Sequence, residues 1–315
     1  MTESEIEDDG MTSEILVIGE NLVDLLVHPD HVDAVIGGGP LNVARTLARL
    51  GASAHFLSGI SADAFGIQIR HSLTTDGVQL AQPGESALPS TLAIVTMDPA
   101  GPSYHFHLQA TSAFAITPPA DDSPDVLYVG TLGLLVEPMA SVGEQLFCEA
   151  PSSTLTVLDP NCRPSATFDP PSYFSRLQRM YQRADVVKVS VEDLDFLGGD
   201  DRVEAAHSIL AAGARCVIVT DGPDPVRVLH REYELAIPVP PTDIVDTVGA
   251  GDSLTGGFIA WWTGHNFGRT ELDDATLVSD GISAAIEISR RTCQQPGAQP
   301  PYAADVRELD SWRWL

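Results

Sequence analysis

The residues best suited to chemistry form the sequence Gly249-Ala250-Gly251-Asp252, which follows an extended segment. Glycine on both sides of the alanine lets the backbone turn tightly and opens its N–H groups to close approach. The next residues, SLTGGFIAWW at 253–262, are typical of a buried helix. The N-terminus of such a helix favours an anion such as phosphate. Asp252 in the first turn could then take a proton from an attacking hydroxyl, although the pattern also fits a plain capping aspartate.

Other polar loops follow predicted strands in the same half of the chain. From residue 126 onward, strands alternate with helices, which predicts a parallel sheet with right-handed crossovers. The loops at the strand ends read Asp159-Pro160-Asn161, Lys188-Val189-Ser190 and Thr220-Asp221-Gly222. Ligands of open α/β sheets bind beyond the carboxyl ends of the strands. We therefore expect these loops to meet the 246–252 segment at one edge of the sheet.

The N-terminal part contains a second glycine-rich segment. A buried strand is predicted at 15–19, and Gly37-Gly38-Gly39 precedes a helical pattern that Gly51 ends. The triple glycine fits close approach by a ligand and tight packing of helix on strand equally well. Two further segments, 22–36 and 91–108, alternate apolar and polar residues and predict strands, with a His/Asp-rich turn around 28–33. His105 and His107 fit an exposed strand face better than a metal site.

Composition limits the class of protein. The 315 residues are enough for one large α/β domain or two ordinary ones, and no linker separates them, so we predict a single domain over 14–310. The net charge of −27 argues against nucleic acid and anionic membranes as partners. Four isolated cysteines predict reduced, mostly buried thiols. The acidic start predicts a disordered leader over 1–13, and without a signal peptide or membrane span we expect a cytoplasmic protein.

With these motifs in hand, the chain resembles the ribokinase-like (PfkB) carbohydrate kinases over about residues 14–307. GGGPLNVARTLARLG matches the N-terminal signature of the family, and DTVGAGDSLTGGF matches its C-terminal signature. LDPNCRPS and KVSVEDL are most similar to the fructokinase and 2-keto-3-deoxygluconate kinase branch. The resemblance implies a three-layer α/β/α fold with a mostly parallel central sheet. The segments at 22–36 and 91–108 would then form a small β-sheet lid over the sugar, which in this family often takes part in a dimer interface.

The resemblance also implies roles for individual residues. Asp252 would be the base that deprotonates the sugar hydroxyl, and the amides of Gly249, Ala250 and Gly251 would surround the transferred phosphoryl group. The predicted sugar-binding residues are Asp24, Gly37, Gly38, Asn42, Tyr104 and Arg163. The predicted ATP-binding residues are Lys188, Thr220 and Gly222. Asp193 is the candidate for a Mg²⁺ ligand acting through water, and Asp246, with carbonyls of the 291–297 loop, is the candidate for a K⁺ site.

The chain departs from the family pattern at several positions. The arginine that the branch often places after an aromatic residue is missing at His107-Leu108, which disfavours an acidic sugar. The magnesium motif Asn-x-x-Glu reads Ser190-Val191-Glu192-Asp193, and the second glycine of the nucleotide loop is absent around Asp224-Pro225. We expect an ATP-dependent kinase for a fructose-like ketose. The alternatives are a 2-keto-3-deoxygluconate or ribose kinase, a nucleoside kinase whose base packs on Tyr104 and Phe106, and a sugar-binding protein without catalysis.

Overall fold

The computed structural model describes residues 13–98, 101–119, 123–198, 201–313 of the chain. Apart from Ser13, the predicted leader over 1–13 lies outside these residues, and the prediction of one domain over 14–310 stays a prediction. Within the described chain, every helix is too short or too polar to cross a lipid bilayer. All four cysteines are free thiols, but they are not mostly buried as predicted: Cys162 and Cys216 are buried, Cys293 is half-buried and Cys148 is exposed.

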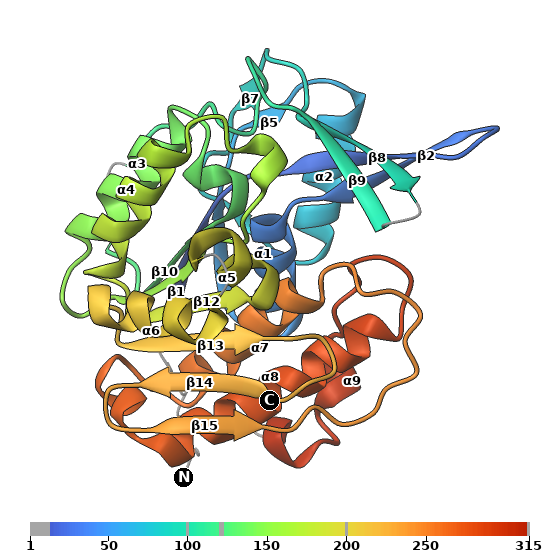
Figure 1. Cartoon of the computed structure of the whole chain (residues 1–315). Coiled ribbons are helices and arrows are strands. Elements are labelled where there is room, and N and C mark those ends of the chain that lie inside the picture. Colours follow the sequence, from blue (N-terminus) through green and yellow to red (C-terminus); the bar gives the residue numbers. More distant parts are fainter. Residues whose placement is uncertain (1–12, 99–100, 120–122, 199–200, 314–315) are drawn as a thin grey trace, which may run out of the picture.

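A large sheet forms the middle layer (Figure 1). In the described residues it has nine strands, in the order β15-β14-β13-β12-β11-β10-β1-β4-β6. Their bounds are β1 Glu14–Ile18, β4 Ser53–Leu57, β6 Gln79–Leu80, β10 Val126–Gly130, β11 Leu155–Asp159, β12 Val186–Ser190, β13 Cys216–Thr220, β14 Val226–His230 and β15 Glu234–Ile237. Strands β4, β1, β10, β11, β12 and β13 pair in parallel, as predicted. Their carboxyl ends therefore lie at one edge.

Helices cover both faces of this sheet, because successive side chains of a buried strand point to opposite sides. Ile15 and Val17 of β1 join one hydrophobic core, whereas Leu16 and Ile18 join the other. The first core is covered by α1 Gly39–Arg49, α2 Ala64–Thr75, α7 Ala250–Gly264, α8 Ala275–Cys293 and α9 Ala303–Val306. The second is covered by α3 Met139–Glu149, α4 Pro170–Tyr181, α5 Val191–Gly198 and α6 Arg202–Ala212. The predicted α/β/α layering is confirmed.

The far edge of the main sheet differs from the sequence-based expectation. The pattern after residue 220 predicted only a loop and a later extended segment, but β14 and β15 pair antiparallel with β13 and with each other. The chain reverses in a tight turn in which Asp224 N–H donates to the Asp221 carbonyl at 2.9 Å. A turn this short cannot hold a crossover helix, so the next strand must run antiparallel.

The small second sheet expected from residues 22–36 and 91–108 is present. Its strands are β2 Leu22–Val27, β3 Val32–Gly37, β8 Leu92–Asp98 and β9 Gly101–His107, in the order β3-β2-β8-β9. The histidines of β9, His105 and His107, are exposed. The β2–β3 hairpin extends well beyond the body of the molecule and is called the lid arm below (Figure 1). Strands β5 Ile60–Ser61 and β7 Glu85–Ser86 form a separate two-stranded pair.

Candidate active site

Helix α7 begins at the glycine-containing turn that is predicted to bind an anion. Gly249 precedes it with a φ of 77°, a left-handed conformation that favours glycine. A Cβ at this position would lie 2.5 Å from the Cβ of Ala298. The Ala250 N–H donates to the Thr247 carbonyl at 3.2 Å, whereas the N–H groups of the first helical turn precede the intrahelical ladder. The turn therefore presents N–H donors, mainly from Gly251 and Asp252, and the positive end of the helix dipole to an anion.

Asp252 lies in the first turn of α7 and is buried, with 8% of its surface exposed. Its Oδ2 accepts a hydrogen bond of 2.9 Å from Nδ2 of Asn42, which α1 supplies. Burial raises the pKa of Asp252, while the Asn42 hydrogen bond and the charges of Lys188 and Arg163 oppose that rise. A carboxylate that is oriented by a neighbour and has a raised pKa is suited to accept a proton from a hydroxyl.

A cavity of about 330 Å³ opens over Asp252 and runs under the lid. A Cβ at Gly39 would lie 2.7 Å from Thr131 Oγ1 and 3.2 Å from Asp252 Oδ1, so glycine leaves this space open. The predicted residues that line it are Asp24, Gly38, Asn42, Tyr104, Arg163, Gly249, Ala250, Gly251 and Asp252. Gly37 lies just outside this cavity, where a Cβ would come within 2.4 Å of Asp24 Oδ2. It leaves room for the Asp24 carboxylate.

A second cavity, of about 240 Å³, contains the residues predicted to hold the nucleotide, Lys188, Thr220 and Gly222. It shares Ala250 and Gly251 with the first cavity, so the two meet at the N-terminus of α7. The Nζ of the buried Lys188 is 3.3 Å from Asp159 Oδ2. Burial lowers the pKa of Lys188, but the neighbouring carboxylates outweigh that effect and raise it overall. A charged lysine therefore lies beneath the place where an anion would bind.

Comparison with known proteins now places this geometry in a family. Residues 13–301 match the model of the pfkB family carbohydrate kinases. The chain belongs to this family. It is 33% identical over 257 residues to a fructokinase of Rhizobium leguminosarum bv. trifolii, covering 78% of each chain, and 30% identical over 266 residues to a fructokinase of Klebsiella pneumoniae, covering 81% of this chain and 86% of the relative.

The fold agrees with this family assignment. A crystal structure of fructokinase from Xylella fastidiosa with bound ATP superimposes with a TM-score of 0.83 at 23% identity, covering 95% of this chain and 99% of that one. The pfkB chain described here is therefore a phosphotransferase that acts on a sugar hydroxyl, and its fold is the ribokinase-like fold predicted from the sequence.

The two carboxylates of the kinase predicted as metal ligands have other contacts. Asp193 is buried, and its Oδ1 accepts the Cys162 N–H while its Oδ2 accepts the N–H and hydroxyl of Ser190. Its neighbour Glu192 is exposed and lines the second cavity, which is called the nucleotide cavity below. Asp246 accepts the Val248 N–H at 3.0 Å and the Gly297 N–H at 2.8 Å, so it lies beside the 291–297 segment, whose first three residues belong to α8. Asp246 thus lies beside its predicted segment. Asp193 instead forms hydrogen bonds with Cys162, which follows β11, and with Ser190, which ends β12.

Glu20 is a site residue that the sequence did not indicate. It follows β1 and has only 1% of its surface exposed. It lines the first cavity, over Asp252, which is called the sugar cavity below. Its Oε2 accepts the Gly133 N–H at 3.1 Å. Burial raises the pKa of Glu20 to about 8, against the opposing hydrogen bonds of the Glu20 and Gly133 N–H groups and the charge of Arg163. The raised pKa favours the protonated carboxyl, which can donate a hydrogen bond to a ligand oxygen.

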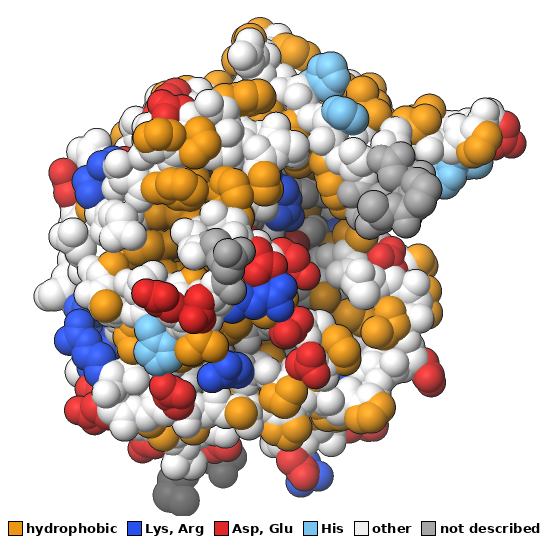
Figure 2. Space-filling view, viewed as in Figure 1, with side chains coloured by type: hydrophobic (Ala, Val, Ile, Leu, Met, Phe, Trp, Pro, Cys, Tyr) orange, Lys and Arg blue, Asp and Glu red, His pale blue; other side chains and the backbone are white. Residues whose placement is uncertain are grey.

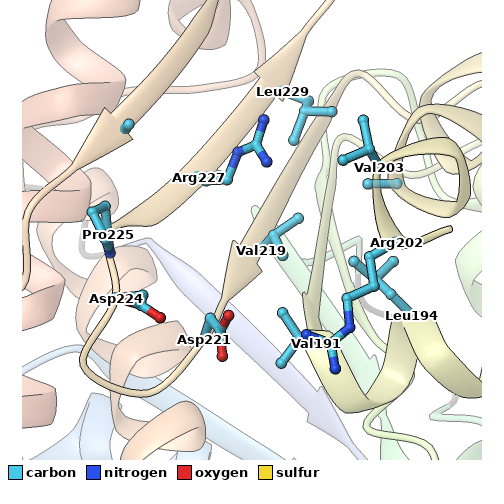
Figure 3. Close-up of a pocket in the computed structure, with 12 residues that line it drawn as sticks. Val191, Leu194, Arg202, Val203, Val219, Asp221, Asp224, Pro225, Arg227 and Leu229 are labelled. Carbon is cyan, nitrogen blue, oxygen red and sulfur yellow. The ribbon is translucent and has the colours of Figure 1, made fainter.

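Pro225, which replaces the usual glycine of the nucleotide loop, faces away from the nucleotide cavity. Asp221, Asp224 and Pro225 line a third cavity, of about 340 Å³, on the other side of β14. Figure 3 shows Arg227 and Val219 facing Arg202 and Val203 across this cavity. Val226, the next residue along the chain, lines the nucleotide cavity instead, since alternate residues of a strand face opposite sides. Thr220, Gly222 and Val226 thus line the second cavity, whereas Pro225 does not.

Proposed function

We propose that this kinase transfers the γ-phosphoryl group of ATP to a hydroxyl of a fructose-like ketose. The observation that supports this most directly is the meeting of the sugar and nucleotide cavities at Ala250 and Gly251. A hydroxyl above Asp252 and a phosphate on the α7 N-terminus would lie side by side there. Phosphoryl transfer needs such positioning, together with compensation of negative charge, more than covalent chemistry.

Each residue of the site has a role in this mechanism. The Asp252 carboxylate accepts the proton of the attacking hydroxyl while Asn42 holds it in place. The amides of Gly251 and Asp252 and the helix dipole stabilise charge on the transferred group, whereas the Ala250 N–H is held by the Thr247 carbonyl. Lys188 and Arg163 add positive charge from the nucleotide side and the sugar side. Closing of the lid over the sugar would exclude water that otherwise hydrolyses ATP.

Metal ions complete the proposal. Mg²⁺ would bind phosphate oxygens of ATP and offset their charge. Because Asp193 is buried outside the lining of the nucleotide cavity and the exposed Glu192 belongs to that lining, Glu192 is the better water-mediated ligand. Asp246 and the carbonyls of the 291–297 loop are the donors for K⁺, a hard cation that suits oxygen ligands.

The charge of the sugar cavity bears on the substrate. Its described lining includes the carboxyl groups of Glu20, Asp24 and Asp252 but a single guanidinium, that of Arg163. Such a cavity suits a neutral polyhydroxyl better than the carboxylate of 2-keto-3-deoxygluconate. One observation favours the nucleoside alternative. The rings of Tyr104 and Phe106 stack with centroids 5.9 Å apart, and both line the cavity, where a base could pack on them.

A panel of acceptors tests the proposal. ADP release would be coupled to an indicator reaction with fructose, ribose, tagatose, 2-keto-3-deoxygluconate and adenosine, each with and without K⁺. We expect the highest kcat/KM with fructose, and a kcat about 10²–10⁴-fold lower for the Asp252→Asn variant. A nucleoside as the best acceptor would replace the proposal with the aromatic-wall alternative. Absence of sugar-dependent ADP release across the panel would leave only a binding role.

The lid supports a further proposal, a homodimer formed through its exposed edge strand β3 and the adjoining end of β2. Val32 and Val35 on the edge strand β3 and Val27 on β2 have 55%, 39% and 40% of their surface exposed. An exposed apolar edge strand of this kind is commonly covered by a second chain. Sedimentation velocity should give twice the chain mass, and Val32→Lys together with Val35→Lys should give the mass of one chain. A wild-type monomer at all concentrations would contradict the dimer.

A further inference from the structure

The tip of the lid arm carries a group of metal-binding side chains that the kinase reaction does not use. Residues 28–31 connect β2 to β3, and the His28 N–H donates to the His31 carbonyl at 2.9 Å to close the turn. His28, His31 and Asp33 gather on this turn, outside the residues that line the sugar cavity. Figure 2 shows histidine and acidic side chains on the outer part of the arm.

The distances between these groups fit a metal-binding shell. His28 Nε2 lies 3.3 Å from Asp33 Oδ2, and His31 Nε2 lies 3.4 Å from the same oxygen. The ligand atoms of all three side chains lie within 4.8 Å of one another. Zn²⁺ binds imidazole nitrogen and carboxylate oxygen at about 2.0–2.2 Å, so neighbouring ligands on a tetrahedral shell are roughly 3.3–3.5 Å apart. The two histidine–carboxylate distances thus match those of neighbouring ligands on one zinc ion, and the two histidine nitrogens lie within 4.8 Å of each other.

A fourth residue orients one of the imidazoles. His31 Nδ1 lies 2.9 Å from Asp30 Oδ1. If His31 donates its Nδ1 proton to this carboxylate, the lone pair of Nε2 faces Asp33 and is available to a metal. Metal-binding histidines usually have such a carboxylate or carbonyl partner on the other ring nitrogen, and it raises their basicity. Asp30 therefore has the place of an outer-shell partner.

The two imidazole rings lie nearly parallel. The centroids of His28 and His31 are 4.4 Å apart and their planes differ by 9°. Because the lone pair of an imidazole nitrogen lies in its ring plane, one of the two rings must turn about its side-chain bonds for both Nε2 atoms to face one ion. Both rings and the carboxylate are partly exposed, so an ion can reach them from solvent.

From this arrangement we propose that His28, His31 and Asp33 form a transition-metal site of the Zn²⁺ type at the tip of the lid arm. Water completes the coordination, because the described chain offers three ligand groups there. Imidazole and carboxylate ligands together suit Zn²⁺ over Mg²⁺, which prefers oxygen ligands alone. The site is separate from the Mg²⁺ and K⁺ of the proposed phosphoryl transfer.

Titration with Zn²⁺ alone tests the site without reference to activity. The full chain without an affinity tag, carrying Cys148→Ser to remove the exposed thiol, would be titrated by calorimetry at pH 7.5. We expect one Zn²⁺ per chain, and at least tenfold weaker binding after His31→Ala or Asp33→Ala. Asp30→Asn should weaken binding about 10-fold or more, because it removes the outer-shell partner. The exposed His71 lies on α2, outside the cluster, so His71→Ala is the matched control and should bind as the parent does.

A second measurement identifies the ligands. The X-ray absorption edge of the bound Zn²⁺ should show a shell of nitrogen and oxygen ligands with multiple scattering from two imidazoles. Thermal unfolding without metal should be the same for the parent and all variants, because these side chains lie on an exposed tip. If zinc does not bind, or binds equally to the parent and to His31→Ala, the turn holds ordinary ion pairs and the proposal is wrong.

Discussion

The two walls of the sugar cavity differ in burial and in the groups they carry. The rear wall, meaning Glu20 and Asp252 with the adjoining Asp159–Lys188 pair, comes from the ends of the main-sheet strands and from α7, and all four residues are buried. The lid wall, meaning Asp24, Tyr104 and Phe106, comes from the small sheet and is only half-buried. The rear wall is thus enclosed by two hydrophobic cores, whereas the lid wall borders solvent.

Electrostatics follow the same division. Burial raises the pKa of Glu20 to about 8 and of Asp159 to about 7, whereas on the lid wall it raises the pKa of Asp24 to about 6. Charge interactions are stronger where water is excluded. We infer that the rear wall controls the chemical step and its pH dependence, and that the lid wall contributes binding and selectivity. Changes to the rear wall should therefore alter kcat and stability, and changes to the lid wall should alter KM.

Replacing Asp252 by asparagine should give the largest effect. The substitution keeps the shape of the side chain and an oxygen for the Asn42 hydrogen bond, but it removes the proton acceptor. General-base catalysis typically contributes about 10²–10⁴-fold to the rate, so kcat should fall by that factor. Sugar binding, measured by calorimetry, should change by less than about threefold, because the same contacts remain.

An exposed aspartate provides the comparison for this variant. Asp243 lies on the loop before α7 and outside the three cavities described above, so Asp243→Asn should keep kcat near that of the parent. If Asp252→Asn retained most of its activity, the division between the walls would lose its basis. Deprotonation of the hydroxyl would then depend on another group.

Glu20→Gln should have the next largest effect, on stability. In the unfolded chain Glu20 ionises with the ordinary glutamate pKa of 4.5, but in the folded state its pKa is about 8. Its contribution to stability is therefore fully present below pH 4.5 and is lost as the pH rises through 8. One pKa unit corresponds to about 1.4 kcal/mol, so the loss reaches about 5 kcal/mol at most. Glutamine, which does not ionise, avoids it.

Urea unfolding at pH 5.5, 7.0 and 8.5 measures this. The free energy of unfolding of Glu20→Gln minus that of the parent should increase steadily over this range. The exposed Glu308→Gln should show a constant difference from the parent. A constant difference for Glu20→Gln as well would mean that Glu20 is ionised throughout. In that case the rear wall would be more accessible to water than its burial suggests.

The sequence made Asp252 a candidate site residue but gave no sign of Glu20, and the reason is physical. The helix after Asp252 and the glycines before it are neighbours in the chain, so a local pattern makes Asp252 a candidate, and the resemblance of two separate segments to one family favours the catalytic role over a plain helix cap. The burial of Glu20 depends on Gly133, which lies 113 residues away in sequence and donates the N–H that holds the carboxyl. A single glutamate after a strand carries no periodic signal of such a distant contact.

The fold shows the same limit. Apolar runs separated by helices predicted the parallel strands and the layers, because their pattern repeats along the chain. Strand β14 was not predicted because VRVLH is short and Arg227 interrupts its apolar run. The turn at Asp221–Pro225 before it looked like the start of a longer loop. The contacts of Asp193 could not be predicted either, since its partner Cys162 belongs to a different strand end. Residues whose roles depend on long-range packing were those that sequence patterns could not resolve.

Tyr104→Phe should have the smallest effect and gives the sharpest test of the lid wall. It removes one hydroxyl from a half-buried ring and leaves the stacking on Phe106 in place. A lost hydrogen bond to a neutral hydroxyl costs about 0.5–1.5 kcal/mol, so KM for the sugar should rise about 2- to 10-fold while kcat stays within about twofold. Tyr233→Phe, whose hydroxyl donates to Leu272 away from both cavities, should leave KM unchanged. If Tyr104→Phe instead slowed turnover by about two orders of magnitude, a lid group would act in the transition state, and the separation of chemistry from binding would fail.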